Sequence, residues 1–283
     1  MKILVISPAK NEAAYIRSTI QSMVKQTKRP DKWIIVDDGS TDDMAEIVES
    51  YTAQYPWIKL IRKETKEESR TGGSKVVRAF YHGYELYKDE DFDIIVKLDA
   101  DLTLPSNYFE LVSSEFEQNG EIGLCGGYCV IEKDGGLIKE HSHDYHVRGA
   151  LKAYRKACWD EIGGFKETWN WDGIDGMHAM YKGWKVKVLN LAVIHHRPTS
   201  TAYEPKGHAY KSGFEAYRTG NDFMLALLRS IFRLKSKPFI LGSAYYMKGF
   251  LAAKQSRAQK VVDKGLARFI RRFTYRRLLK LNF

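Results

Sequence analysis

Short apolar runs alternate with amphipathic stretches along the first hundred residues. The apolar runs have the length of buried strands. The stretches between them repeat apolar residues three and four positions apart, which is typical of helices packed on a core. Strands that alternate with helices form a parallel sheet covered by those helices. The predicted strands are Lys2–Ser7, Lys32–Asp37, Trp57–Ile61 and Asp93–Leu98, and the predicted helices are Glu12–Gln26, Thr41–Tyr51 and Ser74–Tyr87.

The pattern is less regular between residues 121 and 200 and becomes helical after them. In the middle we expect strands at Gly123–Ile131, Val147–Tyr154 and Lys185–Leu191, with helices at Lys156–Ile162 and Asp175–Lys182. The last part has apolar stretches at Phe223–Leu234 and Phe239–Ala253 and an amphipathic one at Lys260–Leu281. The chain is therefore predicted to be an α/β protein with a C-terminal helical extension.

Polar side chains follow three of the predicted strands. Asn11 and Glu12 follow the first strand, Asp37 and Asp38 end the second, and Asp99 begins a polar run after the fourth. Ligands of parallel α/β sheets bind at the carboxyl ends of the strands. We therefore expect these side chains to border one ligand site.

Asp99 and Asp101 are separated by a single residue at the end of a predicted strand. Side chains two residues apart on a strand point to the same side, so both carboxylates can face one cation. Mg²⁺ and Mn²⁺ prefer oxygen ligands and usually reach an enzyme together with substrate phosphates. The pair predicts a metal–diphosphate site, although Asp-x-Asp alone also occurs in solvated loops.

Composition narrows the class of protein. A chain of 283 residues that is 44% hydrophobic can bury a sizeable core and is not expected to be disordered. Its three cysteines are odd in number and lack metal-binding spacing, which favours buried thiols in a reducing compartment. The start does not resemble a signal peptide, and no apolar run has the length of a membrane span. We expect a cytoplasmic protein.

The positive charge is concentrated at the C-terminal end. Residues 234–283 hold 13 of the 45 Lys and Arg residues but only one of the 35 acids, Asp263. Basic amphipathic helices of this kind lie at membrane interfaces, so residues 223–283 are predicted to contact the anionic inner face of the cell membrane. Alternatively, these helices pack on the first domain and expose only their basic face. Nucleic acid is not expected, because no recognition motif is present.

Three motifs occur in the same order as in a known family. They are Pro8-Ala9-x-Asn11-Glu12, Val36-Asp37-Asp38-Gly39-Ser40-Thr41-Asp42 and Leu98-Asp99-Ala100-Asp101. With them the sequence resembles family 2 glycosyltransferases of the GT-A fold, of the bacterial polysaccharide and lipid-linked glycan type. The resemblance implies a Rossmann-like, mostly parallel sheet flanked by helices. It also implies a transferase domain at residues 1–200, with a nucleotide-binding half (1–102) and an acceptor half (103–200), followed by the basic helical extension at 201–283.

The resemblance implies a role for each matching position in binding a nucleotide-sugar. Asp99 and Asp101 would hold Mn²⁺ or Mg²⁺, with His195 as a further ligand and His196 as its alternative. Cationic side chains of the glycine-rich loop 70–75 would approach the diphosphate. The residues implied for donor binding are Pro8, Ala9, Asn11, Glu12, Asp37, Asp38, Arg70, Lys75, Asp99 and Ala100.

The family's catalytic base maps to the segment after Gly163-Gly164-Phe165. Spacing back from Gly183 aligns Asp172 with the acid that serves as general base in inverting members, and Asp175 is the rival position. Trp171 stands where the family usually has another acid, and His178 where it often has an arginine. Trp169 and Trp171 are expected to form an aromatic platform for the acceptor. Asp172 also fits the N-cap of a helix, a role that is compatible with catalysis.

Taken together, the resemblance implies a metal-dependent, inverting transfer of a sugar from a nucleotide-sugar to a hydroxyl of a glycan or lipid-linked acceptor. UDP is the expected nucleotide, with GDP and dTDP as alternatives. Two other readings remain open: a sugar-phosphate nucleotidyltransferase, and a catalytically inactive scaffold recruited to membranes. The first usually has a Gly-rich basic signature after its first strand, and the segment Ser7–Glu12 has none.

Overall fold

The computed structural model describes residues 1–63, 73–197, 204–235 and 237–279. Its first part contains the predicted succession of strands and helices. The strands lie side by side in the order β3-β2-β1-β4, and all of them are parallel. The elements are β1 (Ile3–Ala9), α1 (Ala13–Val24), β2 (Lys32–Asp37), α2 (Met44–Thr52), β3 (Ile58–Arg62), α3 (Ser74–Tyr84) and β4 (Ile94–Leu98).

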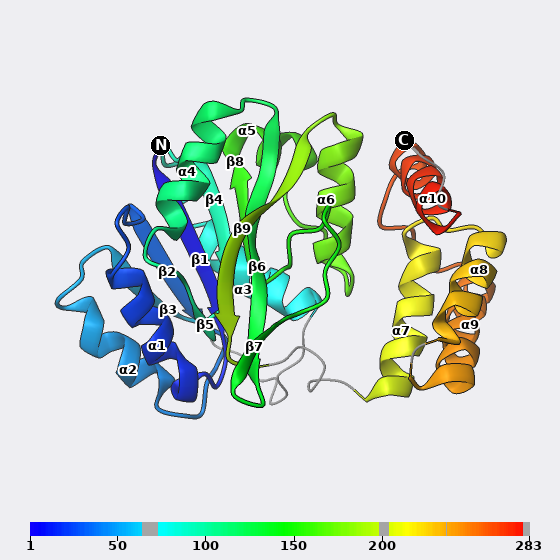
Figure 1. Cartoon of the computed structure of the whole chain (residues 1–283), viewed down its shortest axis with the longest axis horizontal. Helices are drawn as coiled ribbons and strands as arrows, with labels where there is room; N and C mark the ends of the chain where they lie inside the picture. Colours follow the sequence, from blue (N-terminus) through cyan, green and yellow to red (C-terminus); the bar gives the residue numbers. More distant parts are fainter. Residues whose placement is uncertain (64–72, 198–203, 236, 280–283) are drawn as a thin grey trace.

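The second part of the sheet is mixed rather than parallel (Figure 1). Beyond β4 the order continues β8-β6-β9-β5, and β8 runs antiparallel to both of its neighbours. No helix connects β6 to β8, so the chain reverses direction without the crossover that a parallel pair requires. The elements are β5 (Leu102–Thr103), α4 (Tyr108–Gln118), β6 (Ile122–Lys133), β7 (Gly136–Lys139), β8 (Leu151–Arg155), α5 (Lys156–Ile162), α6 (Trp171–Tyr181) and β9 (Lys185–His195).

Several element boundaries differ from the predicted ones, and β9 extends to His195 instead of ending at Leu191. Strand β8 begins at Leu151 instead of Val147, because a turn closed by the Leu151 N–H and the Arg148 carbonyl precedes it. Helix α6 begins at Trp171 instead of Asp175, with Asn170 as its N-cap. The sequence pattern did not reveal α4, β5, β7 or the first helix of the C-terminal part.

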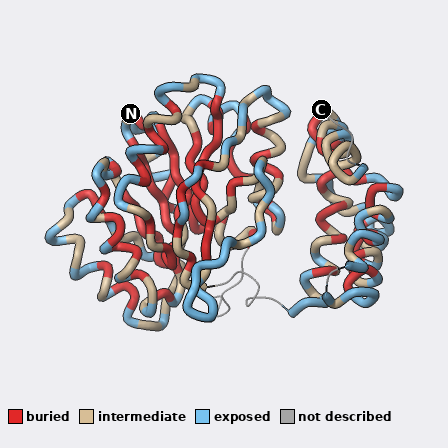
Figure 2. Tube along the Cα trace, viewed as in Figure 1, coloured by how far each residue is buried: buried red, intermediate tan, exposed pale blue. Residues whose placement is uncertain are grey.

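The core lies between the sheet and its helices. Figure 2 shows the central strands buried along most of their length, and β1, β2 and β4 contribute nearly all of their residues to the core. Gly83 of α3 lies against Val36, Ile6 and Ile34, so a side chain there would collide with the sheet. This rigid parallel half presents its carboxyl-end loops at one edge.

The C-terminal part is a separate group of helices beside α6 (Figure 1). It consists of α7 (Pro205–Arg218), α8 (Phe223–Arg233), α9 (Phe239–Gln255) and α10 (Lys264–Leu278). Gly213 and Gly249 let α7 and α9 cross in backbone contact, since a Cβ atom at either would lie within about 2 Å of a carbonyl oxygen. Among the described helices, none combines the length and apolar character needed to cross a membrane.

Candidate active site

The loops after β1 and β2 are tied to each other. The Asn11 N–H donates to Ser40 Oγ (2.9 Å), and the Thr41 N–H donates to Asn11 Oδ1 (2.8 Å). Asn11 has a positive φ of 54°, which asparagine tolerates better than most residues. Asp37 is buried and accepts from the Ser40 N–H at 2.8 Å. The two motifs therefore form one preorganised rim at the sheet edge.

The remaining residues implied for donor binding surround this rim. Pro8 and Ala9 end β1, and Asp38 is paired with Lys63 at 2.5 Å. Lys75 lies in the first turn of α3, half-buried. Arg70 lies outside the described residues, so its predicted approach to the diphosphate stays a prediction.

The segment between Asp99 and Asp101 is fixed by a hydroxyl of helix α1. Thr19 Oγ1 donates to the Ala100 carbonyl (2.8 Å) and accepts from the Leu102 N–H (3.1 Å), and it is fully buried. These two bonds hold the backbone on both sides of Asp101.

Asp99, Asp101 and His195 each offer a ligand atom within 4.8 Å of the others. Strand β5 brings them together because Leu102 pairs with His195 across the β5–β9 ladder. Asp101 Oδ1 lies 3.7 Å from His195 Nε2, and both side chains are almost completely buried. Two carboxylates and an imidazole suit Mn²⁺ or Mg²⁺.

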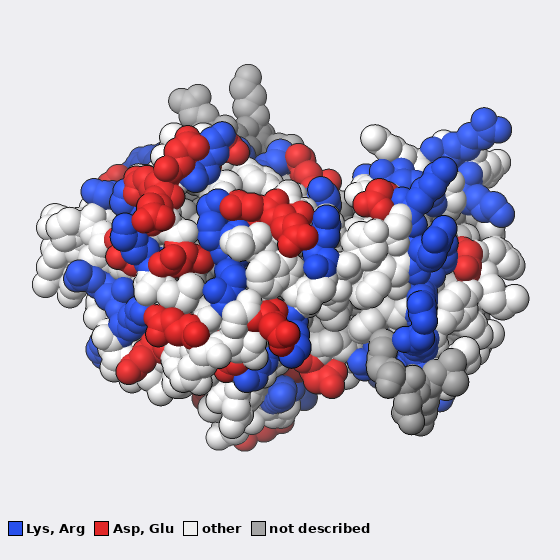
Figure 3. All heavy atoms as spheres, turned by 90° about the horizontal axis from the view of Figure 1, so that it is seen from above, with Lys and Arg blue, Asp and Glu red and all other residues white. Residues whose placement is uncertain are grey.

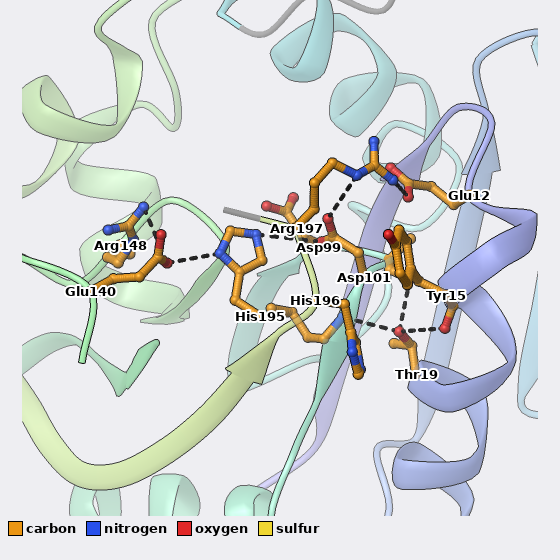
Figure 4. A network of polar contacts seen from close by, with 12 residues as sticks. Glu12, Tyr15, Thr19, Asp99, Asp101, Glu140, Arg148, His195, His196 and Arg197 are labelled. Atoms are coloured by element: carbon orange, nitrogen blue, oxygen red, sulfur yellow. Dashed lines mark hydrogen bonds and ion pairs between the residues drawn. The ribbon is translucent and has the colours of Figure 1, made fainter. Parts of the chain in front are cut away.

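Glu140 orients the His195 ring from the opposite side (Figure 4). His195 Nδ1 lies 2.8 Å from Glu140 Oε2, and Arg148 lies 3.5 Å from the same oxygen. The neutral tautomer that carries its proton on Nδ1 would donate to Glu140 and leave the Nε2 lone pair free on the side of Asp101, which is the arrangement of metal-bound histidines. Burial alone would lower the pKa of His195, but Glu140, Asp101 and Asp99 together raise it.

His196 points away from this cluster. Its ring stacks on Tyr15 with centroids 5.6 Å apart, and its Nε2 lies 2.8 Å from Thr103 Oγ1. Between the two histidines left open by the sequence, only His195 lies in the acid cluster.

Arg197 connects the first loop to the acid cluster. It forms an ion pair with the buried Glu12, and its Nε lies 3.9 Å from Asp101 Oδ2. A cation here partly neutralises the carboxylates, which limits their mutual repulsion in the described structure.

Asp172 stands on the first turn of α6, where an acid interacts favourably with the helix dipole. Its side chain is 38% exposed, and His146 Nε2 lies 3.8 Å from its Oδ2. Burial lowers the pKa of His146 to about 4. Gly149 lies beneath Asp172, since a Cβ there would be 3.0 Å from the Asp172 Cβ. Because Asn170 occupies the N-cap, the capping role considered for Asp172 is wrong.

Asp175 has a different environment, with no exposed side-chain surface. Lys152 Nζ lies 2.6 and 2.7 Å from its two carboxylate oxygens, and the Tyr154 hydroxyl donates to it. Burial raises the pKa of Asp175, against the opposing influence of Lys152 and Tyr154. A carboxylate enclosed in this way cannot reach a bound acceptor.

Trp171, predicted to form part of an aromatic platform for the acceptor, is buried. It is 6% exposed and packs on Phe165, with ring centroids 4.5 Å apart. The ammonium groups of Lys97 and Lys152 lie 5.4 and 5.7 Å from its ring. Lys97 forms an ion pair with Asp99, and Lys152 forms one with Asp175. The Trp171 ring therefore contacts one lysine from each of the two ion pairs.

Trp169 borders a cavity of about 370 Å³ between the sheet domain and α7. The Lys211 ammonium lies 4.5 Å from its ring, and Gly73 lies against its backbone and ring. The cavity is lined by Ser74, Glu167, Thr168, Trp169, Tyr210, Lys211, Phe214, Glu215 and Arg218.

Replacing Lys152 by methionine is expected to lower the free energy of unfolding by roughly 3–5 kcal/mol, because it leaves Asp175 charged and unpaired in the core. Urea unfolding measures the loss. Lys156→Met, which breaks an exposed pair with Asp160, is the control and should cost less than about 1 kcal/mol. Equal effects of the two substitutions would contradict a structural role for the buried pair, whereas Asp175→Asn in the Lys152→Met background should recover part of the loss.

Several residues of the site could not be recognised from the sequence. Glu140 and Arg148 lie in an irregular stretch far from Asp101, and nothing local links them to His195. Lys97 and Lys152 are more visible, because each is a charge inside an apolar strand, and they face each other in the β4–β8 register.

Comparison with known proteins agrees with this geometry. Residues 4–184 match the family model described as Glycosyl transferase family 2. The glycosyltransferase GlyG of Streptococcus pneumoniae is 26% identical over 134 residues, which cover 47% of this chain and 41% of GlyG. The chain therefore spans less than half of that relative.

Two solved structures have the same fold. TarS 1–349 of S. aureus, in complex with UDP-GlcNAc, has a TM-score of 0.56 at 18% identity, covering 90% of this chain and 73% of that one. The mannosyltransferase PcManGT of Pyrobaculum calidifontis, with GDP-Man and Mn²⁺, has a TM-score of 0.55 at 15% identity, covering 95% and 78%. The α/β fold expected from the resemblance is confirmed.

Proposed function

This chain belongs to glycosyl transferase family 2, and we propose that it is a metal-dependent, inverting glycosyltransferase. The observation that carries the proposal is the cluster of Asp99, Asp101 and His195 at the carboxyl edge of the sheet, with Glu140 behind the imidazole. Metal-ligating histidines usually donate their second ring N–H to a carboxylate or carbonyl, and Glu140 supplies such a carboxylate to His195.

The donor is proposed to be a UDP-sugar, as in the complex of TarS, with GDP as the alternative that PcManGT suggests. Its base and ribose would border the loops after β1 and β2, and its diphosphate would lie near Asp99 and Lys75. The proposed donor residues are Pro8, Ala9, Asn11, Glu12, Asp37, Asp38, Arg70, Lys75, Asp99 and Ala100.

Asp99, Asp101 and His195 would hold a Mn²⁺ or Mg²⁺ ion. When bound, the cation supplies Lewis-acid stabilisation of the charge that develops on the leaving nucleoside diphosphate. Glu140 keeps the ring of His195 in the orientation that leaves Nε2 available.

Asp172 is proposed as the general base, since its carboxylate is accessible and that of Asp175 is enclosed. It accepts the proton of the acceptor hydroxyl while that oxygen forms a bond to the anomeric carbon. The bond from this carbon to the diphosphate oxygen breaks on the opposite side, and its electron pair leaves with the diphosphate. Attack from the opposite side inverts the anomeric configuration.

The acceptor is proposed to be a glycan or a lipid-linked glycan of bacterial surface polysaccharide synthesis. Trp169 borders the cavity next to α7 and is the better candidate for an acceptor contact, while the buried Trp171 would position Asp172. Residues 223–283 are proposed to hold the protein on the anionic inner face of the cell membrane.

Thermal unfolding with nucleotides tests this proposal. UDP, GDP, dTDP and CDP are each added with Mn²⁺ or with EDTA. A nucleotide at about a hundred times its Kd should stabilise the protein by roughly 2.7 kcal/mol. We expect stabilisation by UDP that disappears in EDTA. Stabilisation unaffected by EDTA would contradict the metal site, and none at all would favour the inactive scaffold.

A further inference from the structure

Large apolar side chains are exposed along α8 and at the start of α9. Phe223, Leu227 and Ile231 are spaced four residues apart, so they share one face of α8. Exposure ranges from 38% for Leu227 to 75% for Ile240. We name this surface the α8–α9 face, and it consists of Phe223, Met224, Leu227, Ile231, Phe232, Leu234, Phe239, Ile240 and Leu241.

Helix α10, which the sequence pattern singled out for membrane contact, uses its apolar side within the molecule. Leu266 and Ile270 are buried. Phe269 contacts Tyr181 of α6 with ring centroids 5.8 Å apart, and Phe273 contacts Tyr145 at 5.0 Å. Helix α10 therefore packs its apolar side against the rest of the molecule, as the second of the two arrangements considered from the sequence predicts.

Cationic side chains lie at both ends of the α8–α9 face. The Lys254 ammonium lies 5.9 Å from the Phe223 ring, and that of Lys235 lies 5.9 Å from the Phe232 ring. Arg229 is exposed on α8 itself. The sequence has no Asp or Glu between Asp222 and Asp263. Every charged residue between these two acids is therefore cationic, and Asp222, next to Phe223, is itself paired with Arg271 at 3.8 Å.

The charge pattern differs between the two parts of the molecule. Figure 3 shows Lys and Arg gathered in a stripe across the helical part, whereas acidic and basic side chains are interspersed over the sheet domain. A protein partner with a purely apolar patch would not require the ammonium groups of Lys235 and Lys254 at the two ends of the α8–α9 face. In an anionic bilayer, acyl chains match the apolar face, and the headgroups above them match the cations Lys235, Lys254 and Arg229 beside it.

We propose that the α8–α9 face inserts into the surface of an anionic lipid bilayer. The inference rests on the membrane association proposed above and names the surface responsible. Phe223, Leu227 and Ile231 would lie at the boundary between headgroups and acyl chains. Lys235 and Lys254 would extend their ammonium groups to the phosphates, as long cationic side chains do at interfaces.

Vesicle co-sedimentation of the full chain tests the proposal. Vesicles contain phosphatidylcholine alone or with an equal part of phosphatidylglycerol. The test variant combines Ile231→Asp with Ile240→Asp. One control combines Arg268→Gln with Arg272→Gln on α10, and the other is Leu86→Asp, which alters an exposed leucine of the sheet domain. Stabilisation by nucleotide and Mn²⁺ on the same samples reports separately on the proposed transferase site.

We expect binding to anionic vesicles that weakens with salt, because screening reduces the attraction between lysines and headgroups. The Ile231→Asp/Ile240→Asp variant should bind roughly tenfold more weakly or worse, since charges replace the inserting side chains. The Leu86 control should bind like the wild type, and the α10 control should lose much less. Loss confined to the α10 control would overturn the proposed face. Absence of vesicle binding, or a dimer that only the Ile231→Asp/Ile240→Asp variant dissociates, would overturn membrane insertion while leaving the transferase proposal standing.

Discussion

Asp172→Asn should reduce sugar transfer by about 10²–10⁴-fold while leaving the affinity for nucleotide unchanged. The substitution keeps the shape of the side chain and removes its capacity to accept a proton. Nucleotide binding is preserved because the donor loops follow β1, β2 and β4, whereas Asp172 stands on α6. Release of nucleoside diphosphate measures transfer, and calorimetric titration measures binding.

Asp160→Asn is the matched control, since Asp160 is an exposed acid on the neighbouring helix α5. It should leave both quantities unchanged. Full turnover by Asp172→Asn would exclude Asp172 as the base. It would also require Asp175 to leave its enclosure between Lys152 and Tyr154, or another mechanism altogether.

Asp101→Ala is expected to abolish both metal-dependent nucleotide binding and transfer. Removing a ligand forfeits several kcal/mol of charge stabilisation, which corresponds to about a thousandfold or more in rate. The side chain is almost completely buried beside His195, and its backbone is fixed by the β5–β9 ladder that begins at the next residue, Leu102. Mn²⁺ titration with and without UDP gives the affinity.

Glu140→Gln should have a smaller effect on Mn²⁺ affinity than Asp101→Ala. Glu140 would act only through His195, and loss of such an outer partner typically costs 10–100-fold in metal affinity. We therefore expect Glu140→Gln to weaken Mn²⁺ binding less than Asp101→Ala does. Unchanged Mn²⁺ affinity in Asp101→Ala would contradict a metal site at this edge of the sheet.

The parallel half of the fold was predictable because its signals are local. Each apolar run is bounded by turn residues, and the polar residues that follow β1, β2 and β4 must meet at one edge once the strands are parallel. Asp99 and Asp101 could be singled out for the same reason. The helices after residue 220 were also predicted, since α8 and α10 have apolar residues on one face and α9 is a long apolar stretch.

Features that depend on distant partners could not be predicted. The burial of Trp171 follows from Phe165 and from the two lysines on β4 and β8, which no local pattern connects to it. Helix α7 has a recognisable start, with Pro205 at its first position and Glu204 accepting from two N–H groups. Its apolar pattern is weak, because Gly213 and not a large apolar side chain meets the backbone of α9.

The double hydrogen bond of Thr19 has a consequence for how this sequence can diverge. Serine at position 19 would retain the hydroxyl, whereas valine, which matches threonine in shape, would leave the Ala100 carbonyl and the Leu102 N–H without this partner. An unsatisfied buried group costs about 1–3 kcal/mol. A residue of helix α1 that is not among the proposed metal ligands thus restrains which substitutions keep the backbone on both sides of Asp101 in place.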